Sequence, residues 1–288
     1  MEYITHLAIL VCIYSILGIS LNLLVGYTGL LFVAQAAFYG IGAYTVAILG
    51  TQFGINFFVS VLVGIVVSGA FALAIGIVLN RFSGDYFALG SLGFNAIIFS
   101  IFLNAQEITR GPLGIPGIPR PSILGFPFTA SPSFFLLALF FLTLVYLCAR
   151  FIVKSSLGRV LKAIREDEEA IQAFGYNTLR FKLALCSASA AMASVAGALF
   201  ASYITFIDPT GFNVSESILI LTIIILGGLA SLRGSLLGAL FLILLPELLR
   251  FVGFPIAVAA QMRQVFYGIL LILLMLYRPQ GIVGKYKL

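Results

Sequence analysis

Charged residues are scarce in this 288-residue chain: they make up 9% of it, against 61% hydrophobic residues. A soluble domain carries about 25% charged residues. Between Glu2 and Arg81 there is no Asp, Glu, Lys or Arg at all, and the mean hydropathy is +1.16. This shortage of charge excludes a water-soluble globular domain and predicts a polytopic membrane protein.

Histidine, cysteine and tryptophan are also rare or missing. His6 is the only histidine, so the chain cannot build a His-based metal site alone, and no metal or other cofactor is predicted. Cys12, Cys148 and Cys186 lie inside apolar runs, as expected of buried thiols rather than a disulfide framework. Because there is no Trp, the aromatic residues at the membrane interfaces are expected to be Tyr and Phe.

The sequence also lacks the pattern G-x-x-x-x-G-K-[ST], which excludes a P-loop ATPase site in this chain. Nine spans of about 20 residues would use most of the chain and leave no room for a soluble catalytic domain. The apolar runs are continuous rather than alternating, which disfavours a β-barrel. We therefore expect a single transmembrane domain over residues 1–288.

The charge-free runs predict an all-α, polytopic integral membrane protein of about nine transmembrane or broken helices. The predicted spans lie near residues 5–25, 28–50, 55–79, 86–105, 133–153, 183–206, 216–232, 235–252 and 261–277. The N-terminus has no basic leader, so the first run is expected to remain as a span. The span 28–50 has an alternative interpretation as a broken or re-entrant segment.

Two polar segments separate the apolar runs, and their charges predict the orientation. Residues 104–132 are rich in Gly and Pro, whereas residues 154–182 are charged. Placing 154–182 in the cytoplasm leaves four basic residues outside: Arg110, Arg120, Arg250 and Arg263. The positive-inside rule then predicts the N-terminus outside, the C-terminus inside and an extracytoplasmic loop over 104–132.

The most polar stretch, residues 157–175, is predicted to form a short amphipathic helix ending near Gly175. Its apolar residues recur at helical spacing: Val160, Ile164, Ile171 and Phe174. Its basic side holds Arg159, Lys162 and Arg165, and four acids follow at 166–169. A helix lying on anionic headgroups should be basic on its polar face. The acids therefore favour docking into a groove of a soluble partner over a helix that rests on the membrane.

Glycines and a few polar side chains mark two further regions. The predicted helix breaks and close packing sites are Gly26, Gly29, Gly40 and Gly42 in the first region and Gly227, Gly228, Gly234 and Gly238 in the second. One Gly-interrupted region in each half of the chain hints at an internal repeat. Asn22, Gln35 and Asn95 either form interhelical hydrogen bonds or contact a substrate along a translocation path.

Acids inside the predicted spans are almost absent. Glu247 is expected to be the only acid well inside a span, and it lies three residues from Arg250. A local ion pair is the simpler interpretation of this pair, with a proton relay as the alternative. Ion-coupled carriers usually keep ionisable groups near the membrane midplane. The energy source is therefore expected to lie in another polypeptide.

Four blocks of this sequence resemble the LivM-type permease subunits of bacterial ABC importers for branched-chain amino acids. The blocks are residues 21–44, 109–120, 158–175 and 226–239. The run from Glu169-Ala170 to Gly175 is similar to the E-A-A-x-x-x-G pattern of ABC importer permeases, with Ile171 in place of the second Ala. Phe32-Val33-Ala34 departs from the Ser-Leu-Gly that the family usually has there.

The resemblance implies that residues 158–175 couple the permease to ATPase subunits. The residues implied are Gly158, Arg159, Ile164, Arg165, Glu168, Glu169, Ala170, Ile171, Phe174 and Gly175. It also implies three kinds of protein partner: a second, related permease in a heterodimer, two cytoplasmic ATPases and an extracytoplasmic substrate-binding protein. The further partner is the lipid of a bacterial inner membrane. No nucleic acid partner is expected, and the chain itself would not be an enzyme.

The cargo implied by the resemblance is leucine, isoleucine or valine. Related permeases carry urea, short amides or sugars, so a permease for urea, short-chain amides or other amino acids is one alternative. An ion-coupled secondary carrier is another. A membrane enzyme is a third, but the acids at 166–169 have no histidine nearby.

Overall fold

A computed structural model describes residues 2–82, 84–123, 126–128, 131–250, 268–269, 272, 276 and 280–284. The longer helices are α1 (Glu2–Thr28), α2 (Gln35–Gln52), α3 (Phe57–Leu79), α4 (Asp85–Asn104), α6 (Ser131–Lys154), α9 (Thr178–Ile204), α10 (Val214–Gly227) and α11 (Leu232–Arg250). The shorter ones are α5 (Gln106–Thr109), α7 (Ser156–Glu166), α8 (Glu168–Ala173) and the 3₁₀ turns η1 (Gly111–Leu113) and η2 (Pro209–Phe212).

Short strands pair only at the loops. The antiparallel pairs are β1 (Ile115–Pro116) with β4 (Phe206–Ile207) and β2 (Ser122–Ile123) with β3 (Phe126–Pro127). The first pair joins the loop after α4 to the loop after α9. The predicted extracytoplasmic segment 104–132 is therefore held against the bundle by backbone hydrogen bonds over part of its length.

Five of the described helices are long and apolar enough to cross a bilayer: α1, α3, α4, α6 and α9. The number rises to six if α10 and α11 form one bent span. All five coincide with predicted spans, and the chain is an all-α membrane protein. The predicted span 261–277 falls almost entirely outside the described residues, so the count of nine stays a prediction.

The chain between α1 and α2 is not helical. Gly29 has a positive φ of 73°, and the helix begins again only at Gln35. A side chain supplies a hydrogen bond here, because Ser91 accepts from the Val33 N–H at 2.9 Å; in the first turn of α2, Ser217 accepts from the Ala36 N–H at 2.9 Å. Irregular backbone inside a membrane needs such partners. A continuous span over 28–50 is therefore wrong, and the broken alternative describes the structure.

The helices α10 and α11 meet at a sharp bend of 119°. Residues 228–231 separate them, and Gly228 and Ala230 both have positive φ, 109° and 56°. We call residues 228–231 the elbow. The predicted spans 216–232 and 235–252 correspond to these two helices, which form a broken span or a re-entrant loop.

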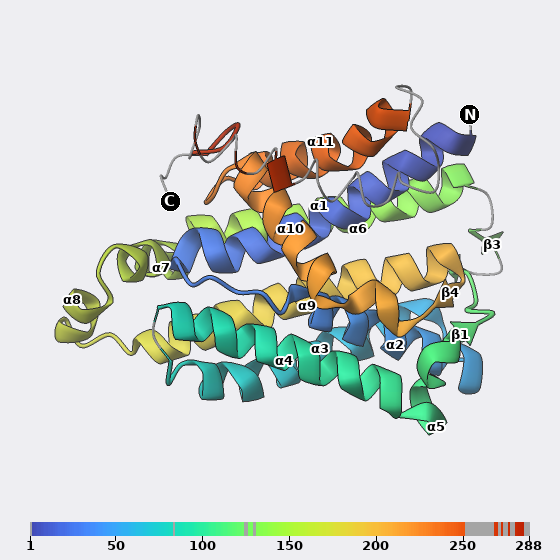
Figure 1. The fold of residues 1–288 in the computed structure, drawn as a ribbon, viewed down its shortest axis with the longest axis horizontal. Coiled ribbons are helices and arrows are strands. Elements are labelled where there is room, and N and C mark those ends of the chain that lie inside the picture. The colour runs from blue at the N-terminus through green and yellow to red at the C-terminus, as the bar shows by residue number, and fades with distance from the viewer. Residues whose placement is uncertain are drawn as a thin grey trace.

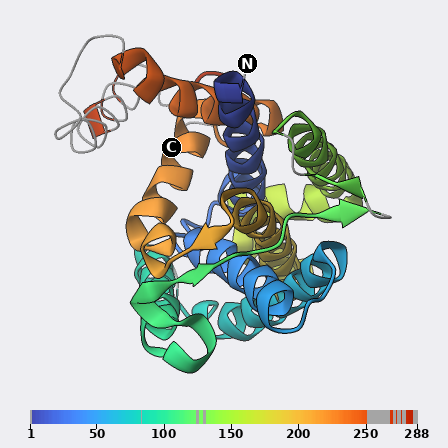
Figure 2. The ribbon, with the colours of Figure 1, turned by 90° about the vertical axis from the view of Figure 1, so that its right-hand side faces the viewer.

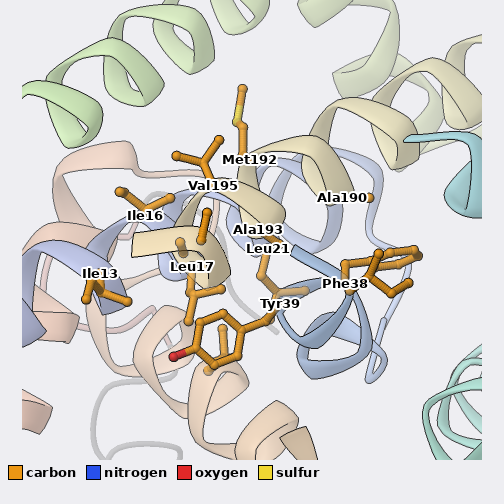
Figure 3. Close-up of a cluster of buried hydrophobic side chains, with 14 of the residues drawn as sticks. Ile13, Ile16, Leu17, Leu21, Phe38, Tyr39, Ala190, Met192, Ala193 and Val195 are labelled. Carbon is orange, nitrogen blue, oxygen red and sulfur yellow. The ribbon is translucent and has the colours of Figure 1, made fainter. Parts of the chain in front are cut away.

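The core lies where α1, α2 and α9 meet, and most of α2 is buried inside the bundle (Figures 1 and 2). Figure 3 shows Ile13, Ile16, Leu17 and Leu21 of α1 beside Phe38 and Tyr39 of α2 and Ala190, Met192, Ala193 and Val195 of α9. A Cβ at Gly197 would lie 1.9 Å from the Tyr39 carbonyl oxygen, and one at Gly42 would lie 2.2 Å from the Ser194 carbonyl oxygen. Glycine thus lets the backbones of α2 and α9 touch.

The two ends of the bundle differ. Figure 1 places α7 and α8 at one end, and the N-terminus, α5 and β1 at the other. Asn80, just after α3, and Lys182, in the first turns of α9, line one small pocket. The end of α3, with the adjacent Arg81, and the start of α9 therefore lie at the same end of the bundle. Basic residues predicted to face the cytoplasm therefore gather at the end that carries α7.

Candidate functional site

The helix α7 is anchored to the bundle. The Ser155 hydroxyl oxygen accepts from the Gly158 N–H at 3.4 Å and caps its first turn. Leu161 and Ile164 are buried, and α7 packs against α1, α6 and α9. A Cβ at Gly158 would lie 2.3 Å from the Val153 carbonyl oxygen, so this close turn requires glycine. The apolar face of α7 therefore contacts the chain's own helices.

The prediction of one amphipathic helix over 157–175 is wrong, because the helix breaks at Asp167. The Asp167 N–H donates to the Ala163 carbonyl and ends α7 (3.0 Å), and its side chain accepts from the Ala170 N–H and starts α8 (3.0 Å). The predicted apolar stripe is divided: Ile164 is 4% exposed, whereas Phe174 is 79% exposed. Ile164 is used in folding, Val160 and Ile171 are partly buried, and Phe174 is left for other contacts.

The helix α8 projects from the end of the bundle and buries none of its residues (Figure 1). It is tied back to α9 by an ion pair of 2.5 Å between Glu168 and Lys182 and by a hydrogen bond of 3.0 Å from Gln172 to the Thr178 hydroxyl. Glu169 is exposed, as is Arg159 on α7, while Ala170 and Ile171 are partly buried. Gly175 has a positive φ of 85°, which turns the chain after Phe174.

Two basic side chains of α7 hold the end of α1. Arg165 donates a hydrogen bond to the Gly26 carbonyl oxygen. The Lys162 ammonium lies 5.6 Å from the centre of the Tyr27 ring. The Tyr27 hydroxyl in turn donates to the Ala230 carbonyl in the elbow at 2.9 Å. Contacts therefore run from α7 through α1 to the elbow.

Asn22 makes the second link between α1 and the elbow. Its amide nitrogen has two hydrogens, which are shared among three acceptors: the carbonyls of Gly228 (3.2 Å) and Ser231 (3.1 Å) and the Ser235 hydroxyl (2.7 Å). Its amide oxygen accepts from the Ala230 N–H at 2.9 Å. These bonds use the donors and acceptors of the side chain, as the interhelical alternative requires.

The predicted glycines lie at close contacts of the backbone. A Cβ at Gly26 would lie 2.5 Å from the Ala230 nitrogen, and one at Gly29 would lie 3.2 Å from Arg165 Cγ. Near the elbow, an added Cβ would also meet backbone atoms. The shortest distances from such a Cβ are 2.1 Å at Gly227 to the Gly234 carbonyl oxygen, 2.4 Å at Gly234 to the Gly227 carbonyl oxygen, 2.2 Å at Gly238 to the Ile223 carbonyl oxygen and 2.2 Å at Gly228 to the Gly284 nitrogen. A Cβ at Gly40 would meet the Phe102 ring at 2.5 Å.

Gln35 and Asn95 are both fully buried but differ in their partners. The Gln35 amide nitrogen donates to the hydroxyls of Ser20 (2.7 Å) and Ser189 (3.4 Å), which links α1, α2 and α9. The Gln35 amide oxygen has no partner within the described part of the chain, and neither does either polar atom of the Asn95 amide. The structure brings Gln35 and Asn22 into interhelical contacts but gives Asn95 no such bond.

Glu216, in the first turn of α10, is a partly buried acid that the sequence analysis did not single out. The Tyr14 hydroxyl donates to a Glu216 carboxylate oxygen at 2.6 Å. Asn213 caps α10, its side chain accepting from the Glu216 N–H at 3.1 Å. An Asn three residues before a Glu is a signal for a helix start. That signal would have placed Glu216 in the first turn of a helix that begins near residue 214. The Glu247 side chain lies outside the described residues.

No group of three or more His, Cys, Asp or Glu that could hold a metal ion occurs among the residues that the structure describes.

Comparison with known proteins identifies the class of this chain. Residues 3–275 match the family described as the permease component of the branched-chain amino acid transport system, and the chain belongs to this family. It is 35% identical to the high-affinity branched-chain amino acid transport system permease protein LivM of Salmonella typhimurium, over 96% of this chain and 69% of that protein. It is 34% identical to LivM of Escherichia coli over the same shares.

Less similar relatives are also named as permeases. The chain is 28% identical to the permease LivH of Escherichia coli, over 94% of this chain and 91% of LivH. It is 26% identical to the autoinducer 2 import system permease LsrC of Salmonella paratyphi B, over 68% of this chain and 61% of LsrC. No solved structure matches this chain.

Proposed function

We propose that this chain is one of two related permease subunits of an ATP-driven importer for leucine, isoleucine and valine in a bacterial inner membrane. The observation that carries the proposal is the similarity to LivM over 96% of the chain. The LivM and LivH relatives support a heterodimer, because both are similar to this chain over nearly its whole length. ATP hydrolysis belongs to two partner ATPases, and an extracytoplasmic binding protein delivers the cargo.

In the proposed orientation, α7 and α8 face the cytoplasm, the N-terminus and residues 104–132 lie outside, and the C-terminus lies inside. The gathering of basic residues at the α7 end supports this orientation, because Lys and Arg are retained on the cytoplasmic side. The binding protein then docks at the outer end, where η1 exposes Leu113 (83% exposed).

Coupling runs through α7 and α8. The ATPases contact α8 through Phe174 and Glu169, an apolar and an acidic side chain that the bundle leaves exposed. When the ATPases close, α8 moves α7, and the Arg165 bond to Gly26 passes this movement to α1 and the elbow. The cargo crosses between the two permeases as the helices at the elbow shift by alternating access.

A second cargo class has one observation in its favour. The autoinducer 2 permease LsrC matches 68% of this chain, so the same scaffold accommodates a chemically different solute. Competition measurements separate the two cargo classes. Excess leucine, isoleucine or valine blocks the uptake of a labelled cargo only if these amino acids use the same transport site as that cargo. Urea, short amides and sugars serve as further competitors. Uptake driven by an ion gradient without ATP would instead indicate a secondary carrier.

The docking role is tested by co-purification with the ATPase subunits. Phe174→Asp and Glu169→Lys are expected to lose the ATPases and ATP-driven uptake while the permease pair stays intact. Leu113→Asp, an equally exposed residue at the other end, is the matched control and should retain the ATPases. If both α8 variants keep the ATPases and the full rate of uptake, the docking role is wrong.

A further inference from the structure

Glu216 is an ionisable group at the middle of the bundle. Its partner Tyr14 lies one residue from the midpoint of α1 (Glu2–Thr28). A helix of 27 residues is about 40 Å long, and the hydrocarbon core of a bilayer is about 30 Å thick. The Glu216 carboxylate is therefore near the centre of the membrane when α1 spans it.

Within the described part of the chain, no Lys, Arg or His side chain pairs with this carboxylate, whose contact is the Tyr14 hydroxyl. An acid at membrane depth without a cation is costly, and such residues usually face a solute path or a partner charge. Glu216 and Tyr14 are both only partly buried, so this face of the bundle is not sealed.

The surroundings of Glu216 combine polar and apolar surface. The Tyr39 hydroxyl is buried and has no hydrogen-bond partner among the described residues, and its helix α2 is joined to α10 by the bond from the Ala36 N–H to the Ser217 hydroxyl. On the other side, Tyr14 and Leu219 pack against a small apolar cluster formed by Ile223, Ala239 and Leu242 of α10 and α11. Tyr14, which contacts the carboxylate, and Leu219, one helical turn after Glu216, are the partly buried residues at the edge of this cluster. A negative charge next to such an apolar edge matches a small cation that carries an aliphatic group.

We propose that Glu216, positioned by Tyr14, binds the α-ammonium group of the amino acid during its passage through the membrane. The inference rests on the proposed function, because it names the contact that a zwitterionic aliphatic cargo makes at the midpoint of the path. The cargo's ammonium supplies the counter-charge that the described part of the chain does not, and its side chain lies toward Leu219 at the edge of the apolar cluster. No covalent step is involved.

The test compares two variants in the full importer, purified with its companion subunits and reconstituted in proteoliposomes. Glu216→Gln keeps an oxygen that accepts the Tyr14 bond but removes the charge. Glu216→Asp keeps the charge but shortens the side chain. The readouts are ATP-driven leucine uptake per assembled complex and ATP hydrolysis stimulated by the binding protein. Glu2→Gln, at an exposed acid at the end of α1, is the control.

We expect Glu216→Gln to lower the maximal uptake rate about tenfold or more while stimulated ATP hydrolysis stays within about twofold. Glu216→Asp should retain more uptake than the Gln variant. Three results would overturn the inference and assign Glu216 a structural role. They are more uptake by Glu216→Gln than by Glu216→Asp, equal uptake by Glu216→Gln and the wild type, and a Gln variant that no longer assembles.

Two further measurements distinguish a failure of this inference from a failure of the proposed function. If collapsing the proton gradient with an ionophore stops wild-type uptake as completely as Glu216→Gln does, Glu216 is a proton relay and the inference is wrong. If the wild-type importer takes up none of leucine, isoleucine and valine with ATP, the proposed function fails first. Normal wild-type uptake with an unaffected Gln variant defeats the Glu216 inference alone.

Discussion

Gly197 marks the closest contact between α2 and α9. Because a Cβ there would lie 1.9 Å from the Tyr39 carbonyl, Gly197→Ala has to push the two helices apart. Overpacking of this kind costs about 1–3 kcal/mol. We expect a clear drop in the thermal unfolding midpoint of the purified protein. Gly93→Ala in α4, with nothing within 4 Å of the added Cβ, is the control. Equal midpoints for the two variants would show that α2 and α9 are not in close contact.

Asn22 tests the connection between α1 and the elbow. Interhelical hydrogen bonds in membranes average about 0.6 kcal/mol, so losing the bonds of this side chain in Asn22→Leu should cost about 2 kcal/mol. Asn104→Leu removes a single bond to the Ser100 carbonyl on the same helix and is the control. Thermal unfolding in detergent measures both. A smaller loss for Asn22→Leu than for the control would contradict the observed network.

Single residues also show what the sequence could predict. The glycine pattern predicted close helix packing, and the buried polar residues predicted interhelical bonds at Asn22. The depth of Glu216 could not be predicted from hydropathy. It depends on the chain between α9 and α10 turning back toward α2, where the Ser217 hydroxyl accepts from Ala36. That is a contact between residues far apart in the sequence.

In the proposed coupling, α7 passes the movement of the ATPases to α1. Arg165→Met keeps the unbranched apolar stem of the side chain but removes the guanidinium, and with it the bond to the Gly26 carbonyl. We expect the ATPases to stay bound and hydrolyse ATP, while uptake per ATP hydrolysed falls about fivefold or more. Arg150→Met, at an exposed arginine of α6, is the control. Unchanged uptake per ATP in the Arg165 variant would exclude this bond from coupling.

The long helices were predictable because a run of about 20 apolar residues has few alternatives in a membrane. The breaks were harder to predict. Residues 29–34 are as apolar as a span, but the Ser91 side chain accepts a hydrogen bond from the irregular backbone at Val33, and Ser217 accepts one from Ala36 in the first turn of α2. Asp167 breaks the predicted amphipathic helix because its side chain caps α8, while α7 turns its apolar face to the bundle. Tertiary contacts decided both cases.

For the whole molecule, the orientation gives a prediction for labelling of intact cells. Tyr176 and Leu113 are both exposed and lie at opposite ends of the bundle. With Cys148 replaced by Ala, a membrane-impermeant maleimide should label Leu113→Cys from outside and Tyr176→Cys only after the membrane is opened. Cys12 and Cys186 are buried and should stay unlabelled in both variants. The reverse pattern would invert the topology.

We propose that the energy for transport comes from another polypeptide, so transport should require the whole assembly. The most direct measurement is leucine accumulation in proteoliposomes that contain either this permease with its partner permease, ATPases and binding protein, or this chain alone. We expect accumulation against a gradient only in the complete system, only with ATP, and not with Phe174→Asp. Leucine concentrated by this chain alone under an ion gradient, without nucleotide, would contradict the proposal.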